Sequence, residues 1–181
     1  MPRIAIPMHD DPSHASRPVL DAIRDNLGFV PNVFRLIANS PEVLTCFAAF
    51  QAGLAGTLGA KTRARIALAV AQVNGSDYYL SAHSYLGLNR AGLSAEEIKL
   101  NRHGASGDTR AHAAVDFAAK VARERGRVRG IDIARVREAG FSDAEVVEIV
   151  ALVAENVFTN FLNEVARTEI DFPVVAACEA A

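Results

Sequence analysis

Two junctions of nearly the same design constrain the fold more than any other feature of the sequence. In residues 91–98, and again in residues 139–146, a glycine and an apolar residue precede a serine that is followed three residues later by glutamate. The glycine ends one helix, the serine and glutamate form a capping box for the next, and flanking apolar residues complete a hydrophobic staple. Both segments therefore predict sharp helix-to-helix turns. We interpret their likeness as reuse of a good turn, with an internal repeat of a helical unit as the alternative.

The rest of the sequence is also patterned for helices. Apolar residues recur at helical spacing from Val19 to Leu27, before Gly28, and Ser40 with Pro41 forms another helix start. We expect the helix that follows to turn these side chains inward: Val43, Leu44, Phe47, Phe50 and Leu54. We expect further helices over residues 64–73, 76–91, 109–125, 131–139 and 143–169.

No segment shows the alternating pattern of a strand, so we predict an all-α fold, a single-domain helical bundle. We place the domain at residues 18–173, after a flexible N-terminal segment at 1–17 and before a C-terminal tail at 174–181. The chain has 181 residues, 50% of them hydrophobic, which suits one domain with a sizeable core.

Composition excludes two classes of partner. A net charge of -2, with both signs interspersed, offers no surface for nucleic acid, and no apolar run reaches the roughly 20 residues of a membrane span. The polar N-terminal residues show no export signal. Two distant cysteines, Cys46 and Cys178, fit a reducing compartment, so we expect a cytoplasmic protein.

The segment most informative about function is residues 58–83, which read LGAKTRARIALAVAQVNGSDYYLSAH. This segment resembles the active-site region of the AhpD-like alkylhydroperoxidase and carboxymuconolactone decarboxylase family. That pattern is a glutamate, an apolar helix, Asn-Gly, Cys-x-x-Cys and then a histidine four residues later. Further segments similar to the family, the last of them to its peroxidase-related subgroup, are residues 28–32, 40–44, 156–163 and 168–173. The resemblance covers about residues 18–173 and implies the all-α fold of the family.

The resemblance also implies a chemistry that this sequence cannot perform. In the family one thiolate attacks a hydroperoxide, the second forms a disulfide with it, and the histidine and glutamate relay the proton. Here the cysteine positions hold Ser76 and Tyr79, the glutamate position holds Ala64, and only His83 remains. Neither a serine nor a tyrosine hydroxyl can take part in a disulfide, so we predict that thiol peroxidase activity is absent.

Three functions follow from this pattern. The first is a pseudoenzyme or small-molecule binder on a helical homo-oligomer, as the resemblance implies. The second is an antioxidant hydroperoxide reductase of the family type, and the third is non-redox acid/base chemistry through His83. Each of these residues also has a purely structural alternative. His83 packs against the pocket or caps it, Tyr79 fills the space of a cysteine, and Ser76 only starts a helix.

Glu155 is the other candidate. It lies in an otherwise apolar helical run, where an ionised carboxylate is costly unless paired. We hypothesise that Glu155 points into the former active-site pocket and partners His83 or Tyr79, with Asn156 and Asn160 nearby. In the alternative, Glu155 lies at an interface between subunits or faces solvent. A histidine and one glutamate are too few ligands for zinc, so we expect no metal and no cofactor.

Overall fold

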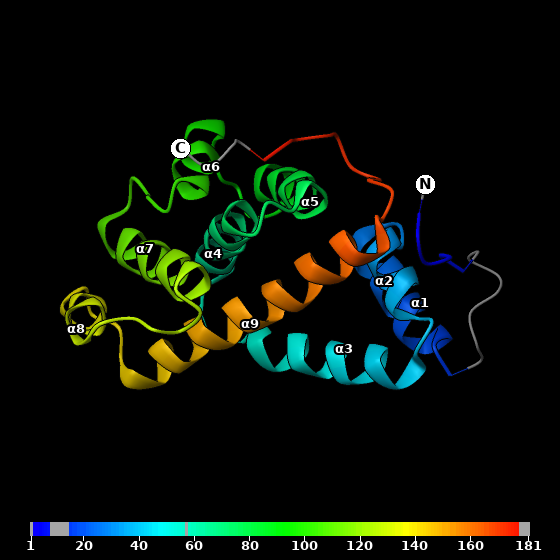
Figure 1. The fold of residues 1–181 in the computed structure, drawn as a ribbon, viewed down its shortest axis with the longest axis horizontal. Helices are drawn as coiled ribbons and strands as arrows, with labels where there is room; N and C mark the ends of the chain where they lie inside the picture. The colour runs from blue at the N-terminus through cyan, green and yellow to red at the C-terminus, as the bar shows by residue number, and fades with distance from the viewer. Residues whose placement is uncertain (1, 8–14, 57, 178–181) are drawn as a thin grey trace.

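The computed structural model describes residues 2–7, 15–56 and 58–177. These residues form helices and no strand, so the predicted all-α fold is confirmed (Figure 1). The helices are α1 (Arg17–Leu27), α2 (Asn32–Ile37), α3 (Pro41–Ala55), α4 (Ala60–Val73), α5 (Asp77–Asn89), α6 (Ala95–Arg102), α7 (Thr109–Arg123), α8 (Gly130–Glu138) and α9 (Asp143–Ala166).

The centre of the fold is α4, which packs against α5, α6, α7 and α9. Its middle is buried on every side, since all six residues from Ile66 to Ala71 are buried. Three of them are alanines, which let neighbouring helices approach closely, and a helix that is apolar all round belongs in a core. The Asn-Gly turn that follows places Gly75 at φ 67°, a left-handed conformation that glycine adopts without steric cost, and α5 begins directly after it.

The long helix α9 crosses the molecule, with α3 on one side of it and α4 and α7 on the other (Figure 1). It begins with the predicted capping box: Ser142 Oγ accepts from the Glu145 amide at 3.2 Å, and Glu145 Oε2 accepts from the Ser142 amide at 2.8 Å. The other junction is only half of the predicted box. Ser94 Oγ accepts from the Glu97 amide at 3.1 Å, but the Glu97 carboxylate accepts from Arg65 instead of returning to the cap.

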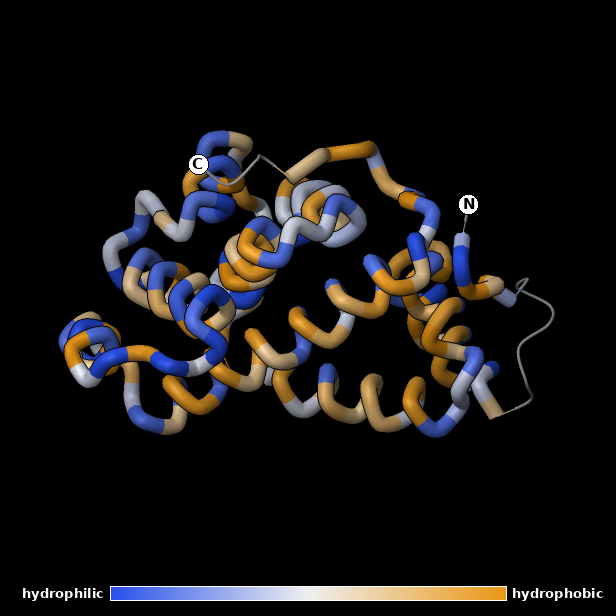
Figure 2. The backbone as a smooth tube through the Cα atoms, in the orientation of Figure 1, coloured by the Kyte–Doolittle hydropathy of each residue, from blue (hydrophilic) through white to orange (hydrophobic). Residues whose placement is uncertain are grey.

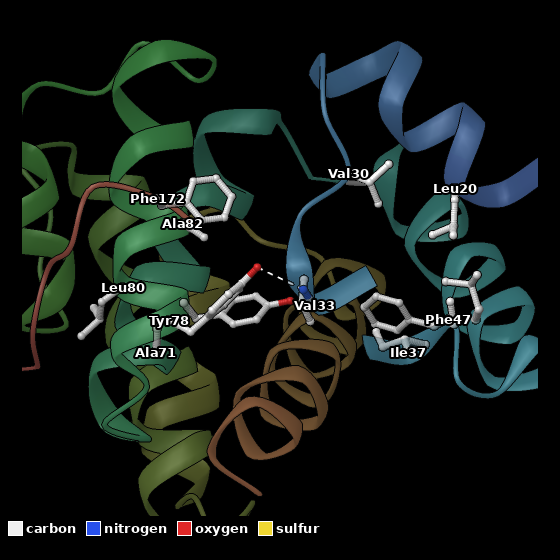
Figure 3. Close-up of a cluster of buried hydrophobic side chains, with 13 residues drawn as sticks. Leu20, Val30, Val33, Ile37, Phe47, Ala71, Tyr78, Leu80, Ala82 and Phe172 are labelled. Carbon is white, nitrogen blue, oxygen red and sulfur yellow. Dashed lines mark hydrogen bonds between the residues drawn. The ribbon is translucent and has the colours of Figure 1, made fainter. Parts of the chain in front are cut away.

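The short helix α2 is capped by residues distant in the sequence. Its N-cap residue is Pro31, whose side chain has no polar group to bond the first helical amides. Asp171 Oδ2 accepts from the Asn32 amide at 2.7 Å, and the Tyr78 hydroxyl accepts from the Val33 amide at 3.1 Å (Figure 3). The same Tyr78 hydroxyl donates to Asp171 Oδ1 at 2.8 Å. The segment after α9 and the start of α5 therefore hold α2 in place.

Residues outside the predicted domain bounds of 18–173 also hydrogen bond to the rest of the chain, and the bounds themselves stay a prediction. The Arg3 amide donates to Ala166 O at 2.7 Å, and the Arg35 guanidinium donates to Pro7 O. At the other end, the Val175 amide donates to Ser81 Oγ at 2.8 Å, so residues after 173 lie along α5. Residues 8–14 and 178–181 lie outside the described residues, and the flexibility of segment 1–17 stays a prediction.

One prediction about α3 is wrong. Leu44, Phe47 and Leu54 are buried as expected, but Val43 and Phe50 are 43% and 41% exposed. The buried residues are three and seven positions apart and form one stripe, whereas Val43 and Phe50 lie on the neighbouring face. Figure 2 shows that hydrophobic residues recur along both α3 and α9.

Candidate functional site

A cavity of about 380 Å³ lies where α1, α3, α4, α5 and α9 meet the segment that carries α2. Most of its lining is apolar, contributed by residues such as Ile23, Phe34, Leu54, Leu86 and Leu152. Its polar lining residues come from every one of these five helices: Asn26, Gln51, Arg63, Tyr78, Tyr79, His83, Glu155 and Asn156. A mainly apolar cavity with a few convergent polar groups is the usual form of a small-molecule site.

The structure brings together most of the residues singled out from the sequence. His83, Tyr79 and Ala64 all line the cavity, so the positions that correspond to the family histidine, second cysteine and glutamate face one space. Ser76 does not line it. Ser76 is fully buried at the N-cap of α5, its side chain makes no capping bond, and its hydroxyl has no hydrogen-bond partner among the described residues.

Neither cysteine contributes a sulfur atom to the described lining. Cys46 is exposed on α3 and lies in a separate shallow groove with Val43, Phe50 and Phe158. Cys178 lies outside the described residues. The cavity itself is lined by aromatic, aliphatic, amide, carboxyl and basic side chains.

His83 is the most unusual polar group of the cavity. Burial of the imidazole lowers its pKa to about 4, an effect that the neighbouring Asn156 side chain partly opposes, so the ring is neutral at pH 7. Its ring lies 4.9 Å, centroid to centroid, from the ring of Tyr79, one turn earlier on α5. The Nε2 atom of His83 is buried and has no hydrogen-bond partner in the part of the chain that the structure describes. Such an atom is costly to leave unpaired.

Glu155 lies half-buried on α9 and lines the same cavity as His83 and Tyr79. Its hydrogen-bond partner is Gln51 of α3, whose Nε2 donates to Glu155 Oε1 at 2.8 Å. Burial raises the pKa of the Glu155 carboxyl, while Gln51 and the nearby Arg63 act to lower it. Burial also raises the pKa of Tyr79, and the charge of Glu155 adds to that rise. The two groups are thus electrostatically coupled across the cavity, while pairing of Glu155 with His83 remains a hypothesis.

Of the two asparagine candidates, only Asn156 lines the cavity. Its Nδ2 donates to Leu152 O at 2.8 Å, one turn earlier on α9. Asn160 is fully buried one turn further on, and its side-chain amide has no partner among the residues described, but the cavity does not extend that far along the helix.

Sequence reasoning missed Gln51 and Arg63, although both carried a signal. Gln51 continues the stripe of Leu44, Phe47 and Leu54, and a polar residue on a buried stripe marks a contact or a site. Arg63 directly precedes Ala64 in the segment that carries the resemblance. Within residues 2–7, 15–56 and 58–177, no group of three or more potential metal ligands forms, and no helix is long and apolar enough to cross a membrane.

Comparison with known proteins points to one family. The model of the carboxymuconolactone decarboxylase family matches residues 41–124, which include α3, α4 and α5. A search of curated proteins finds no match.

Among solved structures, two proteins are similar to this chain over nearly its whole length. An uncharacterized peroxidase-related protein from Silicibacter sp. TM1040 is 25% identical, with a TM-score of 0.81 over 93% of this chain and 91% of the other. An uncharacterized peroxidase-related protein with an alkylhydroperoxidase AhpD core, from Ralstonia eutropha JMP134, is 26% identical, with a TM-score of 0.82 over 94% and 92%. A variant of the debrominase Bmp8, in complex with 2,3,4-tribromopyrrole, is 19% identical with a TM-score of 0.80 over 94% and 93%, and shows a shared fold only.

Proposed function

Because the chain belongs to the carboxymuconolactone decarboxylase family but has Ser76 and Tyr79 at the positions of the family's cysteine pair, we propose that it binds a small molecule and lacks thiol peroxidase activity. The observation that carries this proposal is the cavity around His83. It retains a volume of about 380 Å³ and a mixed polar and apolar lining, with no cysteine among the described residues that line it. The pocket of the family is kept, and the redox pair is not.

The electron balance of peroxide reduction supports the loss of peroxidase activity. Reduction of a hydroperoxide takes two electrons, which a thiolate supplies as it becomes a sulfenic acid and then a disulfide. A tyrosine hydroxyl cannot replace that step, and the Tyr79 pKa, raised by burial, makes the phenol an even poorer nucleophile than usual. Cys46 opens into a different groove.

A second candidate function is non-redox acid/base chemistry through His83. It is favoured by one observation, a half-buried imidazole whose Nε2 atom is buried without a partner among the described residues and whose low pKa keeps the ring neutral. A neutral imidazole can accept a proton from a bound substrate, which is the role of a general base. A binding protein and an enzyme of this kind share the ligand and differ only in turnover.

A ligand screen by thermal shift tests the proposal. We expect some small, mainly apolar compounds to raise the melting temperature of the wild type and to lose this effect in His83→Ala. The matched control is His103→Ala, since His103 is exposed at the end of α6 and does not line the cavity. Circular dichroism of both variants separates loss of binding from loss of fold.

The rival antioxidant function has its own assay. Hydroperoxide consumption driven by a dithiol is expected to stay at the background rate with the purified protein. Turnover that disappears in Cys46→Ser would instead support a peroxidase that works by another route. Homo-oligomer formation, which the resemblance to the family implies, belongs to the proposal. So does a cytoplasmic location, which the two distant cysteines and the polar N-terminal residues favour.

A further inference from the structure

A second hollow shares part of its wall with the cavity. This outer hollow has a volume of about 260 Å³, and Arg90, which is exposed at the end of α5, lies on its wall. The residues that line both spaces are Asn26, Leu27, Ala64, His83 and Leu86. His83 thus lies on the wall between the outer hollow and the inner cavity, beside residues of α1 and α5.

The size of the inner cavity limits what it can hold. A protein cavity of about 150 Å³ is enough for benzene. The inner cavity of about 380 Å³ is more than twice as large, so it suits one substituted ring or two fused rings. The aliphatic and aromatic side chains around it would bury most of such a ring.

The two charged groups on the wall, Arg63 and Glu155, have opposite signs and attract each other, so neither is an isolated counter-ion for a charged ligand. Arg63 Nη1 donates to Ala55 O at 2.6 Å and also to Leu58 O. The Glu155 carboxylate accepts from Gln51 at 2.8 Å. A charged ligand would lose its hydration on entering without gaining a free partner of opposite charge, which is costly. The inner cavity thus favours an uncharged ligand.

His83 defines the one polar contact that the ligand must make. Asn156 acts to raise the pKa of the imidazole, and because Asn156 Nδ2 donates to Leu152 O, the atom that Asn156 can offer the imidazole is the acceptor Oδ1. Because Nε2 has no partner among the described residues, we assign the ring proton to Nδ1, where Asn156 Oδ1 can accept it, and a lone pair that needs a donor to Nε2. The imidazole is neutral, as its lowered pKa of about 4 also requires.

We propose, on the basis of the binding function above, that the cavity takes an uncharged, mainly apolar ring compound whose O–H or N–H donates a hydrogen bond to His83 Nε2. Phenols and azoles are ligands of this class. The hydrogen bond satisfies the buried nitrogen, the ring fills the apolar space, and the absence of a charge matches a wall on which the charges of Arg63 and Glu155 offset each other. In this arrangement His83 determines specificity by selecting donors over acceptors.

A matched pair of probes tests the proposal by calorimetry at pH 7.5. 4-Propylphenol carries the donor, and 4-propylanisole has the same ring with the donor methylated. A phenol has a pKa near 10 and is uncharged at this pH. We expect the wild type to bind the phenol about tenfold more tightly than the ether, since the ether leaves the buried nitrogen unpaired. 4-Propylbenzoate, which is anionic, is expected to bind more weakly than the phenol.

The variant His83→Phe keeps an aromatic ring in place and removes the acceptor. We expect it to bind both probes with affinities within about twofold of each other, while His103→Phe keeps the wild-type preference. Equal affinity for phenol and ether in the wild type would overturn the proposal without any variant. So would a preference that survives His83→Phe, or tighter binding of the benzoate. If none of the probes, nor any compound of the thermal-shift screen, binds, then the binding function fails together with this inference.

Discussion

Replacing Tyr78 with phenylalanine removes a single oxygen atom that holds two parts of the cavity wall together. The Tyr78 hydroxyl caps the Val33 amide in the first turn of α2 and donates to Asp171 beyond the end of α9. Val33 and Tyr78 both line the cavity. The rings of Tyr78 and Phe172 pack edge to face at 6.0 Å, and this contact remains in the variant.

The expected cost follows from what each partner does without the hydroxyl. Val33 is only 3% exposed, so its amide loses its partner and gains no water, which costs about 1–3 kcal/mol. Asp171 is exposed, so water replaces its lost bond at a cost of at most about 1 kcal/mol. The total is about 1–4 kcal/mol, which lowers the melting temperature of a chain of this length by roughly 2–16 °C.

Urea unfolding followed by circular dichroism measures this loss directly. Tyr85→Phe is the matched control, because Tyr85 is 39% exposed on the same helix and also packs against Phe172. We expect the control to change the unfolding free energy by less than about 0.5 kcal/mol. Equal stability of Tyr78→Phe and the control would show that the hydroxyl does not cap α2, and the account of how this wall is held would fail.

Three further predictions concern titration, the polar network and assembly. The pKa of His83 is about 4 in the folded protein and near 6.5 in the unfolded chain. Below pH 6.5 the unfolded chain therefore takes up a proton that the folded protein does not. The free energy of unfolding falls by up to about 3 kcal/mol between pH 6.5 and pH 4 for this reason. His83→Gln should therefore lose less stability than the wild type between pH 7 and 4.5 in urea titrations, and equal losses would contradict the burial of a neutral imidazole. Partial burial of Glu97 would by itself raise the pKa of its carboxyl group. Hydrogen bonds from Ser106, Gly107 and Asn101, together with the charge of Arg65, outweigh burial and lower this pKa to about 2. Glu97→Gln should cost about 3 kcal/mol at pH 7, an effect that declines as the pH falls towards 2, whereas the exposed Glu96→Gln should cost less than about 0.5 kcal/mol. Light scattering should give a mass that is a multiple of 19.3 kDa for the wild type and a shift towards 19.3 kDa for Phe161→Glu, and a monomeric wild type would refute the homo-oligomer. The exposed apolar stripe on α9 that motivates this variant is Val147, Val150, Phe158, Phe161 and Val165.

The helices could be predicted well from the sequence because their ends carry local signals. Ser142 and Glu145 cap α9 as their spacing indicates, and Gly28 ends α1 in a left-handed conformation. The start of α4 was placed too late, at residue 64 rather than Ala60, because its N-cap, Gly59, offers no side chain to mark the boundary. The error at Phe50 has a different cause, since the pattern around residue 50 is apolar on two adjacent faces and only tertiary packing decides which face is buried.

The candidate site could be predicted only in part. Ala64, Tyr79 and His83 lie in the segment that resembles the active-site region of the family, and their spacing was enough to expect them around one cavity. Gln51 could not be assigned as the partner of Glu155, because the contact joins residues 104 positions apart and depends on how α3 lies against α9. The capping of α2 by Tyr78 and Asp171 is likewise a product of tertiary structure.

The most direct test of the central claim is dithiol-driven hydroperoxide turnover, measured side by side for the wild type and the triple variant Ala64→Glu, Ser76→Cys, Tyr79→Cys. Ser76 and Tyr79 are three positions apart at the start of α5, a spacing that brings two side chains onto one face of a helix. We predict no turnover above background for the wild type and dithiol-dependent turnover for the triple variant. Sustained turnover by the purified, metal-free wild type would contradict the claim that this chain has lost the thiol chemistry of its family.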